Sequence, residues 1–244
     1  MNASDPGNIR DTLPAPVRRY FDYALPGTGK AIVRMEAVQQ GTLRTAIDSQ
    51  RWLAFTALHH VEPAATAFAW DARVRMLGPL SLRVSDGFRD GQGYGKVGLG
   101  KHITLARARG DVDMNTAALQ RYLAEAVWYP SALLPRAGVC WSARDDRSAV
   151  ATFRCGNTEA SLEFHFRDDG SVARVYSPAR ARKIGKAFIA TPWEGQLDDY
   201  RECQGFRLPH RARVGWRLND ELTLVWRGEI ERLELELAPG KNDR

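Results

Sequence analysis

Several classes of protein are excluded by what this sequence lacks. Its three cysteines, Cys140, Cys155 and Cys203, are odd in number and form no C-x-x-C pair, so neither a disulfide framework nor a cysteine-based zinc site is expected. No apolar run reaches the ~18 residues of a membrane-spanning helix. The opening stretch, MNASDPGNIRD, has no apolar segment typical of a secretory signal. We therefore expect a soluble, cytoplasmic protein without a membrane span.

The chain also lacks the alternation of strands and helices that builds parallel sheets. From Ala31 onward most segments instead alternate apolar and polar residues with a period of two, which indicates strands with one buried face. The clearest example is Thr66–Leu77, and Asp90-Gly91 is a typical hairpin turn. The pattern predicts a mostly-β protein of the α+β class. We expect one strongly curved antiparallel sheet, a half-barrel, of about eleven or twelve strands.

Two segments have a helical period. Asn115–Trp128 is predicted to be a central helix, with Asn115 or Thr116 as its N-cap and Pro130 ending it. A further turn is expected over Ser131–Leu134. The apolar stripe of this helix consists of Leu119, Tyr122, Leu123, Ala126 and Val127. Leu13–Ala24 is predicted to form a shorter N-terminal helix, and the central helix is expected to cover the concave face of the sheet.

No linker or repeat divides the chain, so we expect a single globular domain over residues 13–238. Residues 1–12 are interpreted as a flexible lead-in and residues 239–244 as a C-terminal tail. The net charge of +6 comes mainly from arginine. The densest basic run, Arg180 to Lys186, is interpreted as a loop, and it contains few of the stacking aromatics that RNA-binding sheets use. Nucleic acid is therefore not an expected partner, and the oligomeric state is left open.

Three motifs contain residue types that bind cofactors or metals or act as nucleophiles, and each is interpreted as structural. Gly93–Gly98 matches G-x-G-x-x-G, but a strand follows it rather than the helix that a dinucleotide site requires, so no cofactor is expected. His59 and His60 are adjacent on a strand and point to opposite faces, so we predict no metal site. Cys203 and His210 form a weak candidate nucleophile–base pair, because nothing nearby favours a thiolate.

Polar residues of the central helix and of the segment Trp193–Arg201 are the candidate site residues. Glu125 is interpreted either as a surface ion pair with Arg121 or as a carboxylate at the rim of a cavity. Arg201 or Arg182 is a further candidate partner for Glu125. The weak catalytic candidates are Glu125, Asp199 and Tyr200. The candidates for lining a ligand pocket are Tyr122, Glu125, Trp128, Trp70, Trp193 and Arg201.

Four stretches of the chain resemble a family of bacterial proteins of unknown function. They are LPAPVRRYF near the start, FAWDAR at Phe68–Arg73, RYLAEAVWYPSALL in the middle and the PW…DYR…G…P run at Pro192–Pro209. The resemblance covers about residues 13–235. The most specific parts are Arg121, Tyr122, Leu123, Ala124, Glu125 and Pro130, followed by Trp193, Asp199, Tyr200, Arg201 and Gly205. The resemblance implies no activity. At the level of fold the layout looks like that of the bacterial lipoprotein-carrier proteins, in which a helix covers a curled antiparallel sheet.

Three hypotheses for function follow from these observations. The first is a binding protein that holds a hydrophobic or lipid-like small molecule between the sheet and the helix. The second is a hydrolase or isomerase that uses carboxylates converging in that cleft. The third is a structural or interaction module, in which the helix only closes a packed core.

Overall fold

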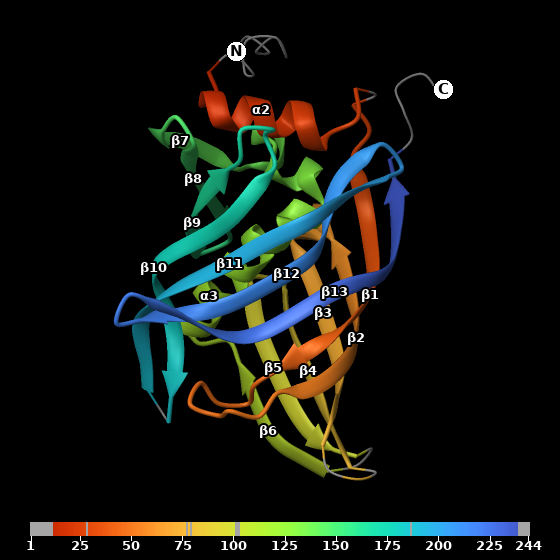
Figure 1. Cartoon of the computed structure of the whole chain (residues 1–244), viewed down its shortest axis with the longest axis vertical. Coiled ribbons are helices and arrows are strands. Elements are labelled where there is room, and N and C mark those ends of the chain that lie inside the picture. Colours follow the sequence, from red (N-terminus) through yellow and green to blue (C-terminus); the bar gives the residue numbers. More distant parts are fainter. Residues whose placement is uncertain are drawn as a thin grey trace.

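The computed structural model describes residues 12–238, apart from 28, 77, 79, 101, 102 and 186. The predicted lead-in and tail therefore lie outside the described residues, except for Thr12. Within the described chain, one antiparallel sheet of thirteen strands carries most of the fold (Figure 1). Two α-helices in this part of the chain accompany the sheet: α2 (Ala15–Ala24) and α3 (Val112–Glu125).

The first six strands precede α3 and the last seven follow it. The first group is β1 (Ile32–Leu43), β2 (Leu53–Glu62), β3 (Ala67–Arg75), β4 (Ser81–Arg89), β5 (Gln92–Leu99) and β6 (Ile103–Arg109). The second group is β7 (Cys140–Asp145), β8 (Ser148–Cys155), β9 (Thr158–Phe166), β10 (Val172–Ile184), β11 (Ala187–Cys203), β12 (Phe206–Leu218) and β13 (Glu221–Leu237). Short 3-10 turns lie at Pro63–Ala65, Ala126–Trp128, Pro130–Leu133 and Pro135–Ala137.

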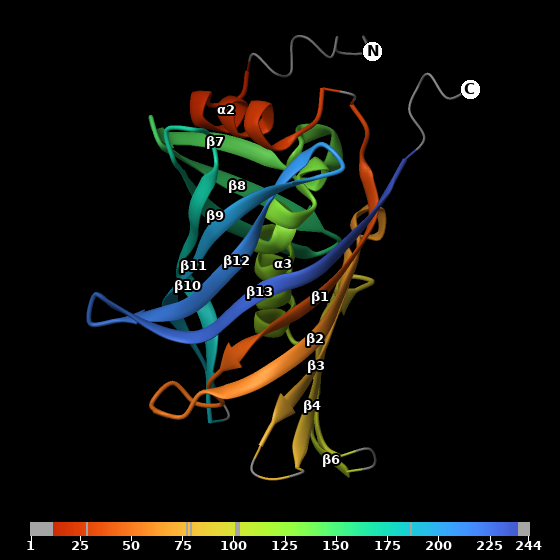
Figure 2. The ribbon, with the colours of Figure 1, turned by 45° about the vertical axis from the view of Figure 1, so that its right-hand side comes forward.

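The order of strands explains why a single helix lies inside the sheet. Each strand pairs with its neighbour in sequence, except that β6 does not pair with β7, and the first strand, β1, pairs with the last, β13, in the middle of the sheet. The two edges are therefore β6 and β7, and α3 belongs to the connection between them. In a flat sheet with strands about 4.8 Å apart, those edges would lie roughly 58 Å from each other. The sheet instead curls around the helix, which packs against both β5 and β9 (Figure 2).

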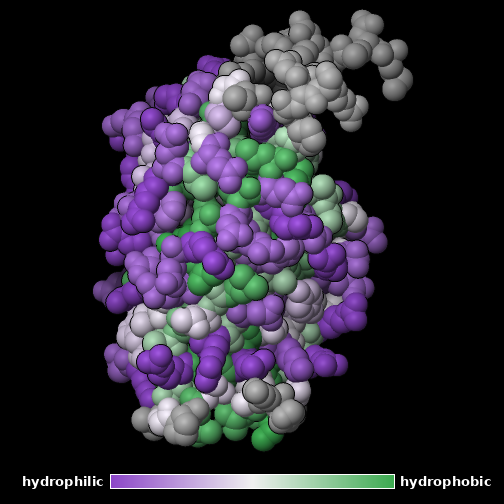
Figure 3. Space-filling model, turned by 90° about the vertical axis from the view of Figure 1, so that its right-hand side faces the viewer, coloured by the Kyte–Doolittle hydropathy of each residue, from purple (hydrophilic) through white to green (hydrophobic). Residues whose placement is uncertain are grey.

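Two groups of buried side chains make up the core. The larger one joins α2 and α3 to strands from both halves of the sheet, and it includes Tyr20, Phe21, Leu119 and Leu123. The apolar residues of α2 that the helical period predicted are all buried, and this helix lies across one end of the sheet (Figure 1). The smaller group lies on β2 and β3 and contains Phe55 and Trp70, among others. The opposite face of the strands is mainly polar, as Figure 3 shows for one side of the molecule.

The mostly-β, curved antiparallel fold with a covering helix confirms the class that the sequence predicted. The central helix starts three residues earlier than expected, because Asp111 is its N-cap and accepts a hydrogen bond from the Met114 N–H at 2.6 Å. It ends at Glu125, and 3-10 turns continue the chain. Asn115, the predicted cap, instead accepts a hydrogen bond from the Gly93 N–H at 2.7 Å.

The second difference concerns the basic run that was interpreted as a loop. Arg180, Arg182 and Lys183 belong to β10, while Lys186 lies outside the described residues. β11 then runs through the whole of the candidate segment Trp193–Arg201. Its alternation is regular, with Trp193 and Leu197 facing the helix side. The long strands β10 and β11 together form one wall of the candidate site.

Candidate functional site

A cavity of about 300 Å³ lies between α3 and the concave face of the sheet. Its walls come from α3 and the turn that follows it, and from seven strands, which are the central β1–β13 pair and strands on both sides of that pair. This volume is at the lower end of the range of about 300–1,000 Å³ that is typical of small-molecule sites. The helix therefore covers a packed core on one side and a cavity on the other.

Apolar and aromatic side chains form most of the cavity wall. Four of the seven tryptophans of the chain line it: Trp70, Trp128, Trp193 and Trp226. Aliphatic side chains fill the spaces between them, namely Leu43, Val127, Val175, Leu197, Val214 and Val225. Two of the indole N–H groups are already bonded within the protein, because Trp70 donates to Gln39 Oε1 at 2.9 Å and Trp128 donates to the Pro209 oxygen at 2.8 Å. These bonds hold the two rings in place as apolar walls.

A cluster of charged groups occupies one side of the same cavity. Arg121 of α3 donates to Glu125 Oε1 and to Asp86 Oδ2, each at 2.7 Å. Its guanidinium carbon also lies 5.1 Å from the ring centre of Phe68 and 5.3 Å from that of Trp70. Arg121 is thus held by two carboxylates and two rings. Burial by itself would lower its pKa, but the charges of Asp86 and Glu125 outweigh that effect and raise it. The pair with Glu125 is not the exposed surface pair that sequence spacing also allowed.

The fully buried ring of His59 lies against the second oxygen of Glu125. The distance from His59 Nε2 to Glu125 Oε2 is 3.2 Å, although the ring N–H is not aligned for a hydrogen bond. Burial by itself would raise the pKa of Glu125, but Arg121 and His59 outweigh that effect and lower it to about 2. His60 points the other way and contacts Glu36 and Glu62, so the prediction that the two histidines face opposite sides is confirmed.

A β-bulge turns Arg180 toward the cavity. Ser177 pairs with Trp193 and Arg180 pairs with Thr191, so Pro178 and Ala179 together stand opposite one residue of β11. Such a bulge shifts the alternation of side chains by one position, and proline is tolerated there because the pairing is already interrupted. Arg180 therefore lies on the same face as Ser177 and lines the cavity.

Four of the six predicted pocket residues line the cavity: Trp70, Glu125, Trp128 and Trp193. Tyr122 does not, because its ring packs against Phe153 in the core and its hydroxyl donates to the Pro63 oxygen at 3.3 Å. Arg201 does not either, because its side chain is exposed and pairs with Asp199 at 2.7 Å.

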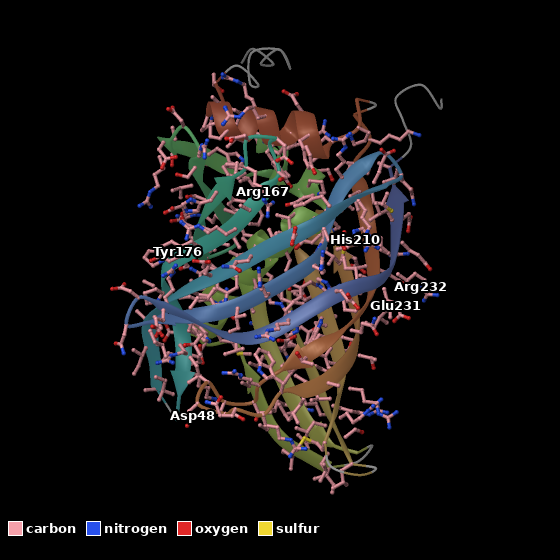
Figure 4. All side chains as sticks on the ribbon, viewed as in Figure 1. Asp48, Arg167, Tyr176, His210, Glu231 and Arg232 are labelled. Atoms are coloured by element: carbon pink, nitrogen blue, oxygen red, sulfur yellow. The ribbon has the colours of Figure 1, made fainter. Side chains whose placement is uncertain are left out.

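The three weak catalytic candidates are not brought together. Asp199 pairs with Arg201 and Arg211, whose side chains are exposed. The Tyr200 hydroxyl donates to the Val172 oxygen at 2.9 Å, an oxygen that also accepts from Arg167 (labelled in Figure 4). Each of these residues thus has partners that Glu125 does not share. The prediction that Arg201 or Arg182 pairs with Glu125 is wrong, since Arg121 and His59 occupy that position.

The candidate nucleophile–base pair gains no support. Burial raises the pKa of the Cys203 thiol, which disfavours the reactive thiolate. The Nδ1 atom of His210, which Figure 4 labels on β12, lies 3.1 Å from the oxygen of Leu208.

Sequence reasoning missed several residues of the cavity. Asp86 and Arg121 pair across 35 positions of the chain, and no local pattern reveals such a pair. Arg180 would face outward if the alternation of β10 were unbroken. Trp226 was visible on the apolar face of its predicted strand and could have been found from that signal.

Fold and site together define a class of protein in which a curved antiparallel sheet surrounds one helix and encloses a largely apolar cavity. The chain matches the Family of unknown function (DUF6920) over residues 11–235 and belongs to that family. No curated protein matches it. No helix in the described part of the chain is long and apolar enough to cross a membrane.

The solved structures that are similar to the chain in fold include the following two. One is a LolA superfamily protein from Nitrosomonas europaea, with 6% sequence identity, a TM-score of 0.46, and coverage of 93% of this chain and 96% of that one. The other is a beta-barrel-like protein of the domain of unknown function DUF1849 from Brucella abortus, with 12% identity and a TM-score of 0.32. That match covers 84% of this chain and 99% of the Brucella protein.

Proposed function

We propose that the protein binds one hydrophobic or lipid-like small molecule in the cavity between α3 and the sheet. The observation that carries this proposal is the cavity of about 300 Å³ with four tryptophans in its wall. Side chains that line an unfilled space have no van der Waals partners on that side. An apolar chain bound in the cavity would supply those contacts. The alternative of a carboxylate-based enzyme has no comparable support, because its three candidate residues have separate partners.

The size of the cavity indicates the size of the ligand. If one methylene group fills about the volume of one water molecule, roughly 30 Å³, the space accommodates a chain of roughly ten carbon atoms. A single acyl or alkyl chain of this length matches both the volume and the apolar wall.

The first test uses 10-bromo-1-decanol, because bromine quenches the fluorescence of tryptophans that it contacts. We expect saturable quenching with one ligand per protein, caused by contact with the four tryptophans of the cavity. Ala212 lines the cavity on β12, so Ala212→Phe fills part of it and should weaken binding at least tenfold. Ala143 is exposed on β7 and lines no part of the cavity, so Ala143→Phe is the matched control and should bind normally.

The melting temperatures of both variants are measured alongside, because a partly filled cavity should keep the fold within about 1–3 kcal/mol of the parent. The proposal fails if the folded parent shows no saturable quenching. It also fails if a folded Ala212→Phe variant binds as tightly as Ala143→Phe.

A further inference from the structure

Arg180 lines the cavity like Arg121, but it lacks the carboxylate partners that Arg121 has among the described residues. The Nη1 atom of Arg180 is buried and has no hydrogen-bond partner among the described residues. No described carboxylate forms an ion pair with it. Its guanidinium carbon lies 4.8 Å from the ring centre of Trp193, a contact that orients the flat group along the cavity wall. A buried guanidinium without a carboxylate is costly, so arginines in such positions are usually paired.

The carboxylates of the cavity are already engaged by Arg121. Asp86 and Glu125 each accept a hydrogen bond from that residue at 2.7 Å, and Glu125 also contacts His59. Both carboxylates therefore make their hydrogen bonds to Arg121, and neither forms an ion pair with Arg180 among the described residues.

The lining of the cavity carries an excess of positive charge. Its charged residues are three arginines, Arg44, Arg121 and Arg180, and two carboxylates, Asp86 and Glu125. Arg44, at the end of β1, also has a buried Nε atom without a hydrogen-bond partner among the described residues. Arg44 and Arg180 thus each have a donor without a partner among the described residues, and the lining has one more positive than negative charge.

The electrostatics of Arg180 agree with this geometry. Burial lowers its pKa, and repulsion by Arg121 lowers it further, so that the pKa falls to about 10 although Glu125 and Asp86 partly offset both effects. An anion beside the guanidinium would counter the burial and the repulsion together.

We infer that the ligand is an amphiphile with an anionic head group, a carboxylate or a phosphate, and that Arg180 binds this head group while the chain lies among the tryptophans. The inference rests on the proposed function and specifies its ligand. Both carboxylate and phosphate present two oxygens that match the paired N–H donors of a guanidinium. Arg44 is placed to contribute a second contact.

The test compares ligands that share one chain and differ in the charge of the head group. Decanoic acid, decyl phosphate, 1-decanol and decylamine are titrated by calorimetry at pH 7.5. We expect the two anions to bind at least tenfold more tightly than decanol, because a hydrogen bond to a charged group contributes about that factor or more. Decylamine should bind most weakly. The relative affinity of decanoic acid and decyl phosphate identifies the head group.

Two variants separate the role of Arg180 from a general effect of charge. Arg180→Gln should weaken the binding of decanoic acid and decyl phosphate at least tenfold and leave that of decanol within about twofold. Arg182→Gln is the matched control, because Arg182 lies on the same strand with an unpartnered Nε atom but does not line the cavity. It should change none of the affinities appreciably.

Each other outcome overturns a specific statement. If decanol binds as tightly as the anions, or if Arg180→Gln weakens decanol and decanoic acid equally, the anionic head group is wrong and the hydrophobic cavity remains. If Arg182→Gln has the same effect as Arg180→Gln, the charge dependence does not come from this site. If none of the four ligands binds the parent protein, the proposed function fails together with the inference.

Discussion

Glu125 is the residue on which the charge balance of the cavity depends. One of its oxygens accepts from Arg121 and the other faces the buried ring of His59. Its side chain is only 15% exposed, so these contacts are shielded from water. Removing a buried carboxylate leaves its partners uncompensated, which is far more costly than losing an exposed ion pair.

We predict that Glu125→Gln lowers the free energy of unfolding at pH 7 by about 3 kcal/mol, which corresponds to the depression of the pKa from 4.5 to about 2. The sign follows from that depression. The folded state holds the carboxylate ionised more strongly than the unfolded state does, so this contribution is complete above about pH 5 and is lost as the pH falls toward 2. Urea unfolding at pH 7, 5, 4 and 3 measures it, and the variant should show a flatter decline toward low pH than the parent.

Glu159→Gln is the matched control, because Glu159 pairs with Arg154 on the surface and both side chains are more than half exposed. An exposed pair contributes about 0–1 kcal/mol, so this variant should follow the parent at every pH. Equal losses in the two variants would contradict the account of Glu125 as a buried counter-charge.

At the scale of the element, α3 is positioned by glycines of β5. A Cβ atom on Gly93 would lie 2.9 Å from both the Ala118 Cβ and the Met114 oxygen, which is closer than real Cβ contacts come. The helix can therefore approach β5 only because this position is glycine, and the Gly93 N–H also donates to Asn115. The first glycine of the glycine-rich motif is thus required by the close packing of the helix on β5.

We predict that Gly93→Ala destabilises the protein by about 1–3 kcal/mol, because the helix backbone must shift to admit the methyl group. Gly95→Ala on the same strand is the control. Its Cβ would meet only the terminal methyl of Met114 at 3.5 Å, an ordinary contact at the end of a flexible side chain. Thermal unfolding of the two variants measures the difference, and similar melting temperatures would show that β5 does not set the position of α3.

Periodicity predicted the elements better than it predicted the site. The stripe of α3 was predictable because Leu119 and Leu123 recur at helical spacing, and both are buried. Trp193 was proposed as a pocket residue, but the long strand β11 that carries it was not predicted. Arg180 was not predictable, because the bulge at Pro178 reverses the alternation of β10 and no local pattern locates such a bulge with certainty. The pairing of Arg121 with Asp86 was not predictable either, since it depends on how the sheet curls around the helix.

At the scale of the whole molecule, the first and last strands meet in the centre of the sheet, and α3 lies within the connection between its two edges. This topology draws both halves of the sheet around one helix. It also explains why the cavity is lined from both halves, with Trp70 from the first and Trp193 and Trp226 from the second. Curvature, covering helix and cavity are therefore consequences of one arrangement of the chain.

The account depends most on the claim that this cavity holds the chain of an anionic amphiphile, and a crystal structure with 10-bromodecanoic acid tests it most directly. We predict one strong anomalous peak for bromine in the cavity among Trp128, Trp193 and Trp226, with the carboxylate density at Arg180. Bromine peaks found only on the outer face of the sheet, or a cavity that stays free of ligand at saturating concentration, would contradict the account.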